Sequence, residues 1–241
     1  MSAPHKDTDS DGFRLRGTAF SRIDAFSDVV FGFAITLLVV SLEVPHTFAE
    51  LNHSLRGFIP FAVCFVLLVL LWYSHFKFFR RYGLHDNGTI VINAALLFVV
   101  LFYVYPLKFL FTVLTNGWIG QDISAFGSTN QMRELMILYG IGFIAVYGLF
   151  TTLHWNAWRQ RIALQLNPVE LFLTRSAMVE YTSMAAVGLV SVFIALFIPR
   201  QYIGVAGLFY MSLSLVGWGH GHWESRQLRR IKSSPAAEML P

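Results

Sequence analysis

The segment RIDAFSD, residues 22–28, places an arginine, two aspartates and a serine directly before the apolar run VVFGFAITLLVV. A carboxylate in an apolar environment must find hydrogen-bond donors or take up a proton. An acidic side chain is also favoured in the first turn of a helix, where the free backbone N–H groups and the helix dipole stabilise negative charge. The spacing therefore predicts a structural hydrogen-bonding group at the start of a buried helix.

The composition of the chain indicates an integral membrane protein. Hydrophobic residues make up 55% of its 241 residues and charged residues 13%, whereas a soluble domain carries about 25% charged residues. The single cysteine, Cys64, lies within the apolar run FAVCFVLLVLL. We therefore expect a buried thiol, with no disulfide within the chain and no cysteine-based metal site.

Six apolar stretches approach the roughly 20 residues that a helix needs to cross the hydrocarbon core. They are residues 24–44, 56–77, 89–112, 133–155, 176–198 and 201–219, with prolines 45, 60, 106, 168 and 199 expected at or near their ends. The predicted fold class is an all-α integral membrane bundle of six transmembrane helices. Residues 1–17 are predicted to be a disordered cytoplasmic N-terminus, 18–225 the transmembrane domain, and 226–241 a basic cytoplasmic tail.

The positions of the basic residues predict the orientation. On a six-span model, fourteen of the 18 lysines and arginines fall on the side of both termini, and the other side holds Arg56, Lys108, Arg133 and Arg200. Cytoplasmic loops carry the excess of Lys and Arg, so both termini are predicted to be cytoplasmic. The net charge of +4 then reflects topology, and no nucleic-acid partner is expected.

The first helix carries a stripe of bulky apolar side chains on one face. At about 100° per residue, the stripe consists of Phe26, Val29, Val30, Phe33, Leu37, Val40 and Val44, with Thr36 at its edge. Ser27 and Asp28 point away from it, toward other helices of the same subunit. Their candidate hydrogen-bond partners are Trp72, His75 and Asn93, and Arg22 is expected to pair with Asp24 or a neighbour.

The segment RIDAFSDVVFGFAITLLVVSLEVP resembles the opening of the transmembrane protein 175 family of endolysosomal potassium channels, in its prokaryotic branch. The family signature, an arginine, three residues and then Phe-Ser-Asp, matches at Arg22, Phe26, Ser27 and Asp28. The following context matches at Phe31, Ala34, Ile35, Thr36, Leu37, Leu38 and Val39. Trp72 and His75 resemble the tryptophan and histidine of the second helix, and Asn93 the asparagine of the third. The resemblance covers about residues 18–225.

The resemblance implies a potassium-preferring cation channel without a carbonyl filter. Single-repeat members form homotetramers whose first helices line the pore, with constricting side chains five, nine and twelve residues after the signature aspartate. Those positions are Phe33, Leu37 and Val40 here. Phe33 departs from the usual Ile or Leu, and four phenyl rings at one level would narrow the pore. A bacterial or archaeal plasma membrane, no cofactor, and K⁺ as the permeant ion are expected.

An apolar ring of this kind gates by dewetting, since it conducts only when it is wide enough to hold water. We expect selectivity to come from partial dehydration of the ion, which costs K⁺ less than Na⁺. Thr36 hydroxyls would help to solvate the ion, while Asp24 at the inner mouth and Glu43 at the outer mouth would concentrate cations. The signature residues would position the first helix without touching ions.

Several other interpretations of these residues stay open. The stripe, Ser27 with Asp28, and His75 are each also explained by packing alone, and His75 by a proton-sensing role. The segment GHGHWE, residues 219–224, is read as an interfacial turn because histidines two apart do not share a helix face for a metal. Arg175 and Glu180 are expected to form an ion pair, within the helix or between helices, near the cytoplasmic face.

Two other function classes compete with a channel. A secondary transporter is the alternative function, but it would place substrate-binding charges at the midplane, usually in two repeats. The chain shows no second repeat and few charges in the middle of its apolar stretches. An enzyme is not expected, because no nucleophile–base pair or ligand set emerges at mid-depth.

Overall fold

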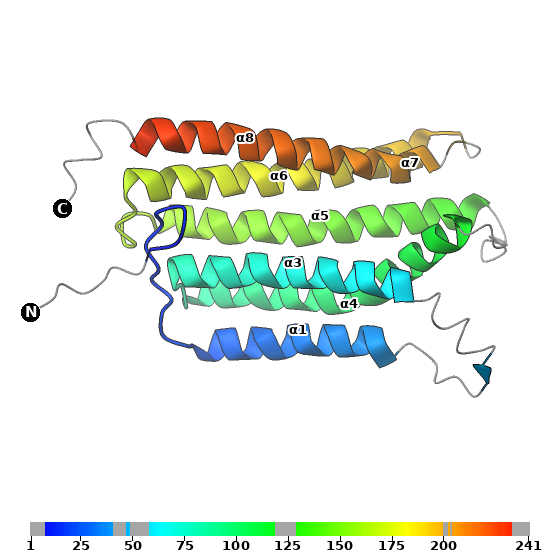
Figure 1. The fold of residues 1–241 in the computed structure, drawn as a ribbon, viewed down its shortest axis with the longest axis horizontal. Coiled ribbons are helices and arrows are strands. Elements are labelled where there is room, and N and C mark those ends of the chain that lie inside the picture. Colours follow the sequence, from blue (N-terminus) through cyan, green and yellow to red (C-terminus); the bar gives the residue numbers. More distant parts are fainter. Residues whose placement is uncertain are drawn as a thin grey trace, which may run out of the picture.

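The described chain, residues 8–40, 47–48, 58–118, 129–199, 202 and 204–232 of a computed structural model, is built from helices packed side by side (Figure 1). In chain order they are α1 (Arg22–Val40), α3 (Phe58–Tyr82), α4 (Asn87–Trp118), α5 (Thr129–Arg159), α6 (Pro168–Phe197), α7 (Gly204–Leu208), the 3₁₀ helix Phe209–Met211 and α8 (Ser212–Lys232). The predicted all-α class is confirmed.

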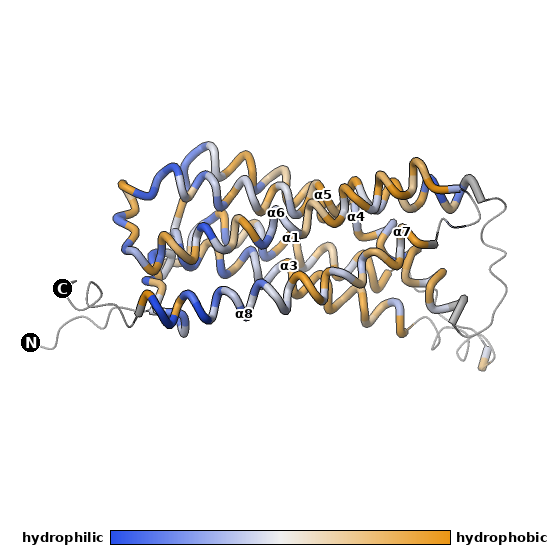
Figure 2. Tube along the Cα trace, turned by 90° about the horizontal axis from the view of Figure 1, so that it is seen from above, coloured by the Kyte–Doolittle hydropathy of each residue, from blue (hydrophilic) through white to orange (hydrophobic). Residues whose placement is uncertain are grey.

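Five of the described helices, α1 and α3 to α6, are long and apolar enough to cross a membrane. A further helical segment, made of α7, the 3₁₀ helix and α8, packs along α6. Hydrophilic residues gather at the end of the bundle where α1 begins and α8 ends, and apolar residues dominate the rest of its length (Figure 2). The chain is therefore a multi-pass membrane protein, and the side on which that polar end lies stays a prediction.

Helix ends differ from the expected ones where local capping chemistry decides them. The helix expected over 176–198 begins at Pro168, because Asn167 accepts a hydrogen bond from the Glu170 N–H (2.8 Å) and the Glu170 carboxylate accepts one from the Asn167 N–H (3.0 Å). This reciprocal capping box, with proline in the first turn, starts the helix a full two turns early. The helix expected to end at 219 continues to Lys232.

Pro106 lies inside α4 and not near its end, contrary to the prediction. Proline interrupts the helical hydrogen-bond ladder, and the second half of α4 bends away toward α5 (Figure 1). One turn later the Leu110 N–H donates to the Tyr139 hydroxyl on α5 (2.8 Å). A side chain from a neighbouring helix thus satisfies a backbone donor beside the bend, as a membrane interior requires.

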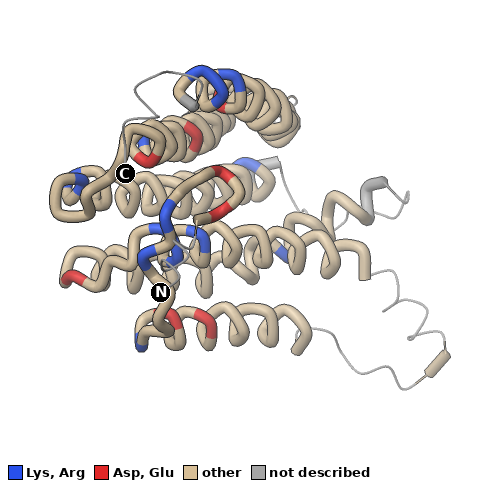
Figure 3. The backbone as a smooth tube through the Cα atoms, turned by 60° about the vertical axis from the view of Figure 1, so that its left-hand side comes forward, with Lys and Arg blue, Asp and Glu red and all other residues tan. Residues whose placement is uncertain are grey.

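Residues 8–17 form an ordered strap across the polar end of the bundle, so the predicted disorder of 1–17 is wrong for them; residues 1–7 lie outside the described chain. Phe13 is fully buried, with the Arg81 guanidinium 4.9 Å from its ring centre. Asp9 and Asp11 bind Arg81 at 2.7 and 2.5 Å. Charged residues accordingly cluster where the strap crosses the helices (Figure 3).

The strap is held at α6 by a single buried carboxylate. Glu170, whose side chain is 0% exposed, accepts hydrogen bonds from the Arg14 Nε (3.0 Å) and the Arg16 Nη2 (2.7 Å). The Arg14 backbone N–H donates to the same carboxylate at 2.9 Å. Because the strap runs directly into α1, these bonds connect the start of α1 to α6, a helix far along the chain.

Candidate functional site

The bulky stripe of α1 faces outward from the bundle. Phe26, Val29, Phe33 and Val40 are 59%, 57%, 61% and 72% exposed, and Leu37 is half-buried. Within one chain, these side chains are therefore free of the bundle core and available to whatever surrounds α1.

The opposite face of α1 is the one that packs into the bundle. It buries Val30, Phe31, Ala34 and Leu38. The helical angle of Val30 placed it in the stripe, but its side chain is buried. Val30 lies at the margin between the stripe and the packed face, and it belongs to the packed face. Thr36 is exposed beside the stripe, and its hydroxyl donates to the Gly32 carbonyl (2.9 Å).

A buried chain of hydrogen bonds attaches α1 to α3 and α4. The Asn93 amide Nδ2 donates to the Ser27 hydroxyl (3.0 Å), and the Asn93 Oδ1 lies 2.7 Å from the His75 Nε2. The Ser27 hydroxyl donates in turn to the Ile23 carbonyl (2.7 Å). All three polar side chains are at most 2% exposed, so each depends on the others for its hydrogen bonds.

Asp28 makes a separate contact at the edge of α1. Its carboxylate accepts a hydrogen bond from the Trp72 indole Nε1 (2.8 Å) on α3. Contrary to the expectation of a buried acid, Asp28 stays exposed, since it lies on the rim between the packed face and the stripe. It borders a small cavity of about 110 Å³ that also contacts Asp24 and His75.

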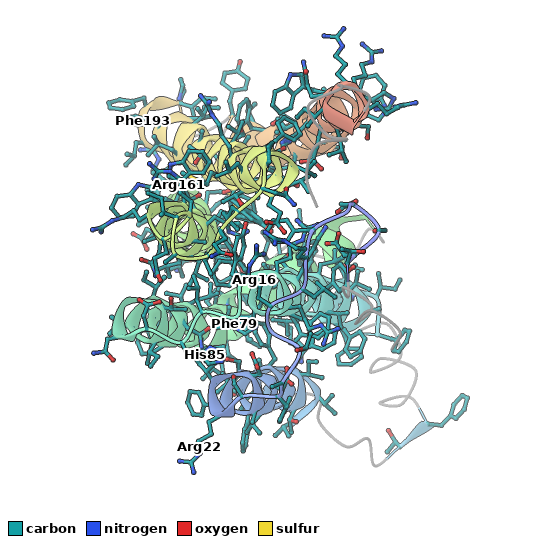
Figure 4. The ribbon with its side chains drawn as sticks, turned by 90° about the vertical axis from the view of Figure 1, so that its left-hand side faces the viewer. Arg16, Arg22, Phe79, His85, Arg161 and Phe193 are labelled. Atoms are coloured by element: carbon teal, nitrogen blue, oxygen red, sulfur yellow. The ribbon has the colours of Figure 1, made fainter. Side chains whose placement is uncertain are left out.

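The predicted contact between Arg22 and Asp24 is not made. The Asp24 carboxylate instead accepts hydrogen bonds from the Ser21 hydroxyl (2.7 Å) and backbone N–H (3.1 Å), which caps the start of α1. The Arg22 side chain extends away from the bundle (Figure 4) and has no hydrogen bond or ion pair within the described part of the chain. Glu43, the predicted outer acid, lies outside the described residues.

The segment GHGHWE is helical, so its interpretation as a turn is wrong; it belongs to α8. His220 lies 3.0 Å from the buried Ser176 hydroxyl of α6, which also donates to Glu224. These contacts dock α8 on α6. No cluster of three or more potential metal ligands occurs among the described residues.

Two polar clusters near the helix ends were missed by the sequence reasoning. One is the strap and Glu170, for which the pattern Asn167-Pro-Val-Glu170 was an available signal of a helix start. The other surrounds Asp86, which accepts hydrogen bonds from the Thr89 hydroxyl (2.5 Å) and the Gln160 amide (3.0 Å). The Asp86 cluster joins the start of α4 to the end of α5.

Comparison with known proteins gives matches along most of the chain. Residues 22–103 match the family described as "Endosomal/lysosomal potassium channel TMEM175". A protein of Marivirga tractuosa named "Potassium channel" is 44% identical over 231 residues, which span 91% of this chain and 93% of that protein. A potassium channel of Chamaesiphon minutus is 37% identical over 93 residues, spanning 35% of this chain and 46% of that protein.

Two solved structures share the fold. The crystal structure of a variant of the potassium channel MtTMEM175, in complex with a Nanobody-MBP fusion protein, superposes with a TM-score of 0.81 at 38% identity, covering 91% of this chain and all of that one. The lysosomal potassium-selective channel homologue from Chamaesiphon minutus superposes with a TM-score of 0.53 at 23% identity, covering 83% and 96%. At that identity the second likeness concerns the fold alone.

Proposed function

The chain belongs to the TMEM175 family, and on this premise we propose that it is a potassium channel whose ion path is lined by α1. The observation that carries the proposal is the two-faced character of α1. The signature residues Asp28 and Ser27 form hydrogen bonds with α3 and α4, while the bulky stripe stays outside the core of its own bundle. A helix anchored in this way presents the stripe in a fixed orientation.

The ion path is proposed to form between copies of the chain. The stripe lies on the outer surface of one bundle, so an enclosed path lined by it needs several α1 helices around a common axis. We take the assembly to be a homotetramer in the plasma membrane of a prokaryote. Rings of Phe33, Leu37 and Val40 would then follow one another along the axis, with Thr36 hydroxyls beside them.

Selectivity in this proposal comes from the cost of dehydration. An apolar ring offers no ligand to replace the water that an ion sheds, so the ion that holds its water less tightly passes more easily. K⁺ is that ion when compared with Na⁺. Phe33 adds the bulkiest of the rings, so this level is expected to set the narrowest width. The half-exposed Asp24 at the start of α1 would raise the local cation concentration.

The test is K⁺ and Na⁺ flux in liposomes that contain only this protein. Replacing Leu37 by alanine shortens the side chains of one ring and widens the ion path at that level, so Na⁺ flux should rise relative to K⁺ flux. Phe33→Ala should have the same effect. Leu189→Ala, which makes the same substitution at an exposed leucine of α6, is the control and should leave the ratio unchanged. Unchanged ratios in both α1 variants would refute the pore assignment, and flux that requires a co-transported solute would favour a secondary transporter.

A further inference from the structure

A second cavity, remote from the stripe of α1, lies between α3, α4, α5 and α6. Its volume is about 250 Å³, and most of its lining is apolar, including Leu67, Leu71, Val100, Val104, Phe143 and Val146. Leu70 lies on its rim and is 55% exposed, so the cavity opens at the lateral surface of the bundle. The mouth of the cavity therefore lies between helices that are long and apolar enough to cross a membrane.

One carboxylate lies at the polar end of this cavity. Glu180 of α6 lines it together with Ser74 and Tyr181. The expected ion pair with Arg175 is absent, and no described residue forms a hydrogen bond or ion pair with the Glu180 carboxylate. At 1.5 Å per residue, Glu180 lies about 18 Å along α6 from Pro168, where an uncompensated charge is costly.

Neighbouring basic groups do not compensate this carboxylate, because acids of the strap already engage them. Glu180 also borders a polar cavity of about 60 Å³ with Lys77, Arg81 and Glu224. Lys77 pairs with Asp11 (3.3 Å), and Arg81 pairs with Asp9 and Asp11. Because Lys77 and Arg81 are engaged in those pairs, neither forms an ion pair with Glu180.

Glu224 does not supply the missing partner either. It accepts a hydrogen bond from Ser176, which also lies 3.0 Å from the His220 Nε2. His220 contacts Ser176 and forms no hydrogen bond or ion pair with Glu180 in the described part of the chain. An apolar cavity that ends at an unpaired carboxylate is complementary to a molecule with an apolar body and a cationic end.

We propose that this cavity is a binding site for a lipophilic amine, whose ammonium group pairs with Glu180 and whose apolar part fills the space between α3, α4, α5 and α6. The aromatic rings of Phe143, Tyr147 and Tyr181 line the site and favour an aryl or alkyl body. An acid of the same shape is excluded, because its carboxylate would meet Glu180. The site is separate from the proposed ion path and does not depend on it.

The test is isothermal titration calorimetry of the full-length protein in lipid nanodiscs, with empty nanodiscs subtracted to remove partition into lipid. The probes are 4-phenylbutylamine, 4-phenyl-1-butanol and 4-phenylbutyrate, which share one apolar body and differ in charge. We expect saturable binding of the amine with one site per chain, roughly tenfold tighter than the alcohol. The acid should bind more weakly than the alcohol.

Two variants test separately what the charge of Glu180 and the space of the cavity contribute to binding. Glu180→Gln should weaken the amine roughly tenfold and leave the alcohol nearly unchanged, since a neutral amide keeps the shape but loses the charge. Met184 lines the cavity one turn after Glu180, so Met184→Trp should fill the space and remove binding of both. Glu134→Gln, which neutralises an exposed acid on α5, is the matched control and should bind like the parent.

The proposal is overturned if the parent protein binds the amine no better than the alcohol, or if it binds the acid as tightly as the amine. It is also overturned if the amine retains its full affinity in Glu180→Gln or in Met184→Trp. Because the three probes are compared on the parent protein, the proposal stays testable even if a variant fails to fold.

Discussion

Replacing Glu170 by glutamine should release the strap of residues 8–17 from α6. The fully buried carboxylate faces two guanidinium groups, and the amide would present an N–H₂ group to donors that need an acceptor. Breaking a buried ion pair by removing one partner costs about 3–5 kcal/mol. The side chains of Arg14 and Arg16 are 32% and 19% exposed, so water compensates part of this loss. We expect about 2 kcal/mol.

Limited trypsin digestion in nanodiscs measures this loss, because Arg14 and Arg16 are cleavage sites that the strap holds against the bundle. When opening and closing are fast, cleavage follows the population of the open form. A loss of about 2 kcal/mol raises that population roughly 30-fold. Cleavage after Arg229, an exposed residue of α8, provides an internal reference that should stay unchanged.

The control variant is Glu134→Gln, which removes an exposed acid of α5 and should cleave at the parent rate. Parental cleavage after Arg14 and Arg16 in Glu170→Gln would show that the carboxylate does not hold the strap. The reasoning would also fail if cleavage after Arg229 rose by the same factor, because this would indicate general unfolding.

Three further predictions concern the same bundle. Gly17→Ala would place a Cβ 2.2 Å from the Phe79 carbonyl oxygen. A backbone atom cannot move aside as a flexible side chain can, so the strap should be displaced and trypsin should cleave it faster. Cleavage at the parental rate would contradict this prediction. Asn93→Leu removes both hydrogen bonds of a buried amide and should lower the free energy of unfolding by about 1–2 kcal/mol, seen as a lower Tm; an unchanged Tm would refute the network. Burial acts to raise the pKa of Asp86, but hydrogen bonds from Thr89 and from α5 outweigh it and lower this pKa to about 2. Its stabilising contribution is thus present above about pH 4 and lost as the pH falls through about 2, so Asp86→Asn should lose less stability than the parent between pH 5 and pH 2, and equal losses would refute this assignment.

The membrane class, the succession of apolar helices and the stripe of α1 were predictable from the sequence. These features depend on composition and on a helical period of 3.6, which any short window of the chain displays. The neighbours of Ser27 and Asp28 were also anticipated, because few polar side chains occur in the apolar stretches and each needs a partner. The hydrogen bonds of Trp72 and Asn93 are such contacts, while the role of these residues in ion flux stays a prediction.

The strap, the exposure of Asp28 and the environment of Glu180 were decided by tertiary structure. From the sequence, residues 8–17 were predicted to be part of a disordered polar N-terminus, because the carboxylate that binds Arg14 lies 156 positions away in the sequence. Glu180 was predicted to form an ion pair because Arg175 is close to it in the sequence, yet the two side chains do not form one. Local pattern determines which residues become helical and which face is apolar, whereas pairing between charges depends on distances in space that only the packing of distant helices sets.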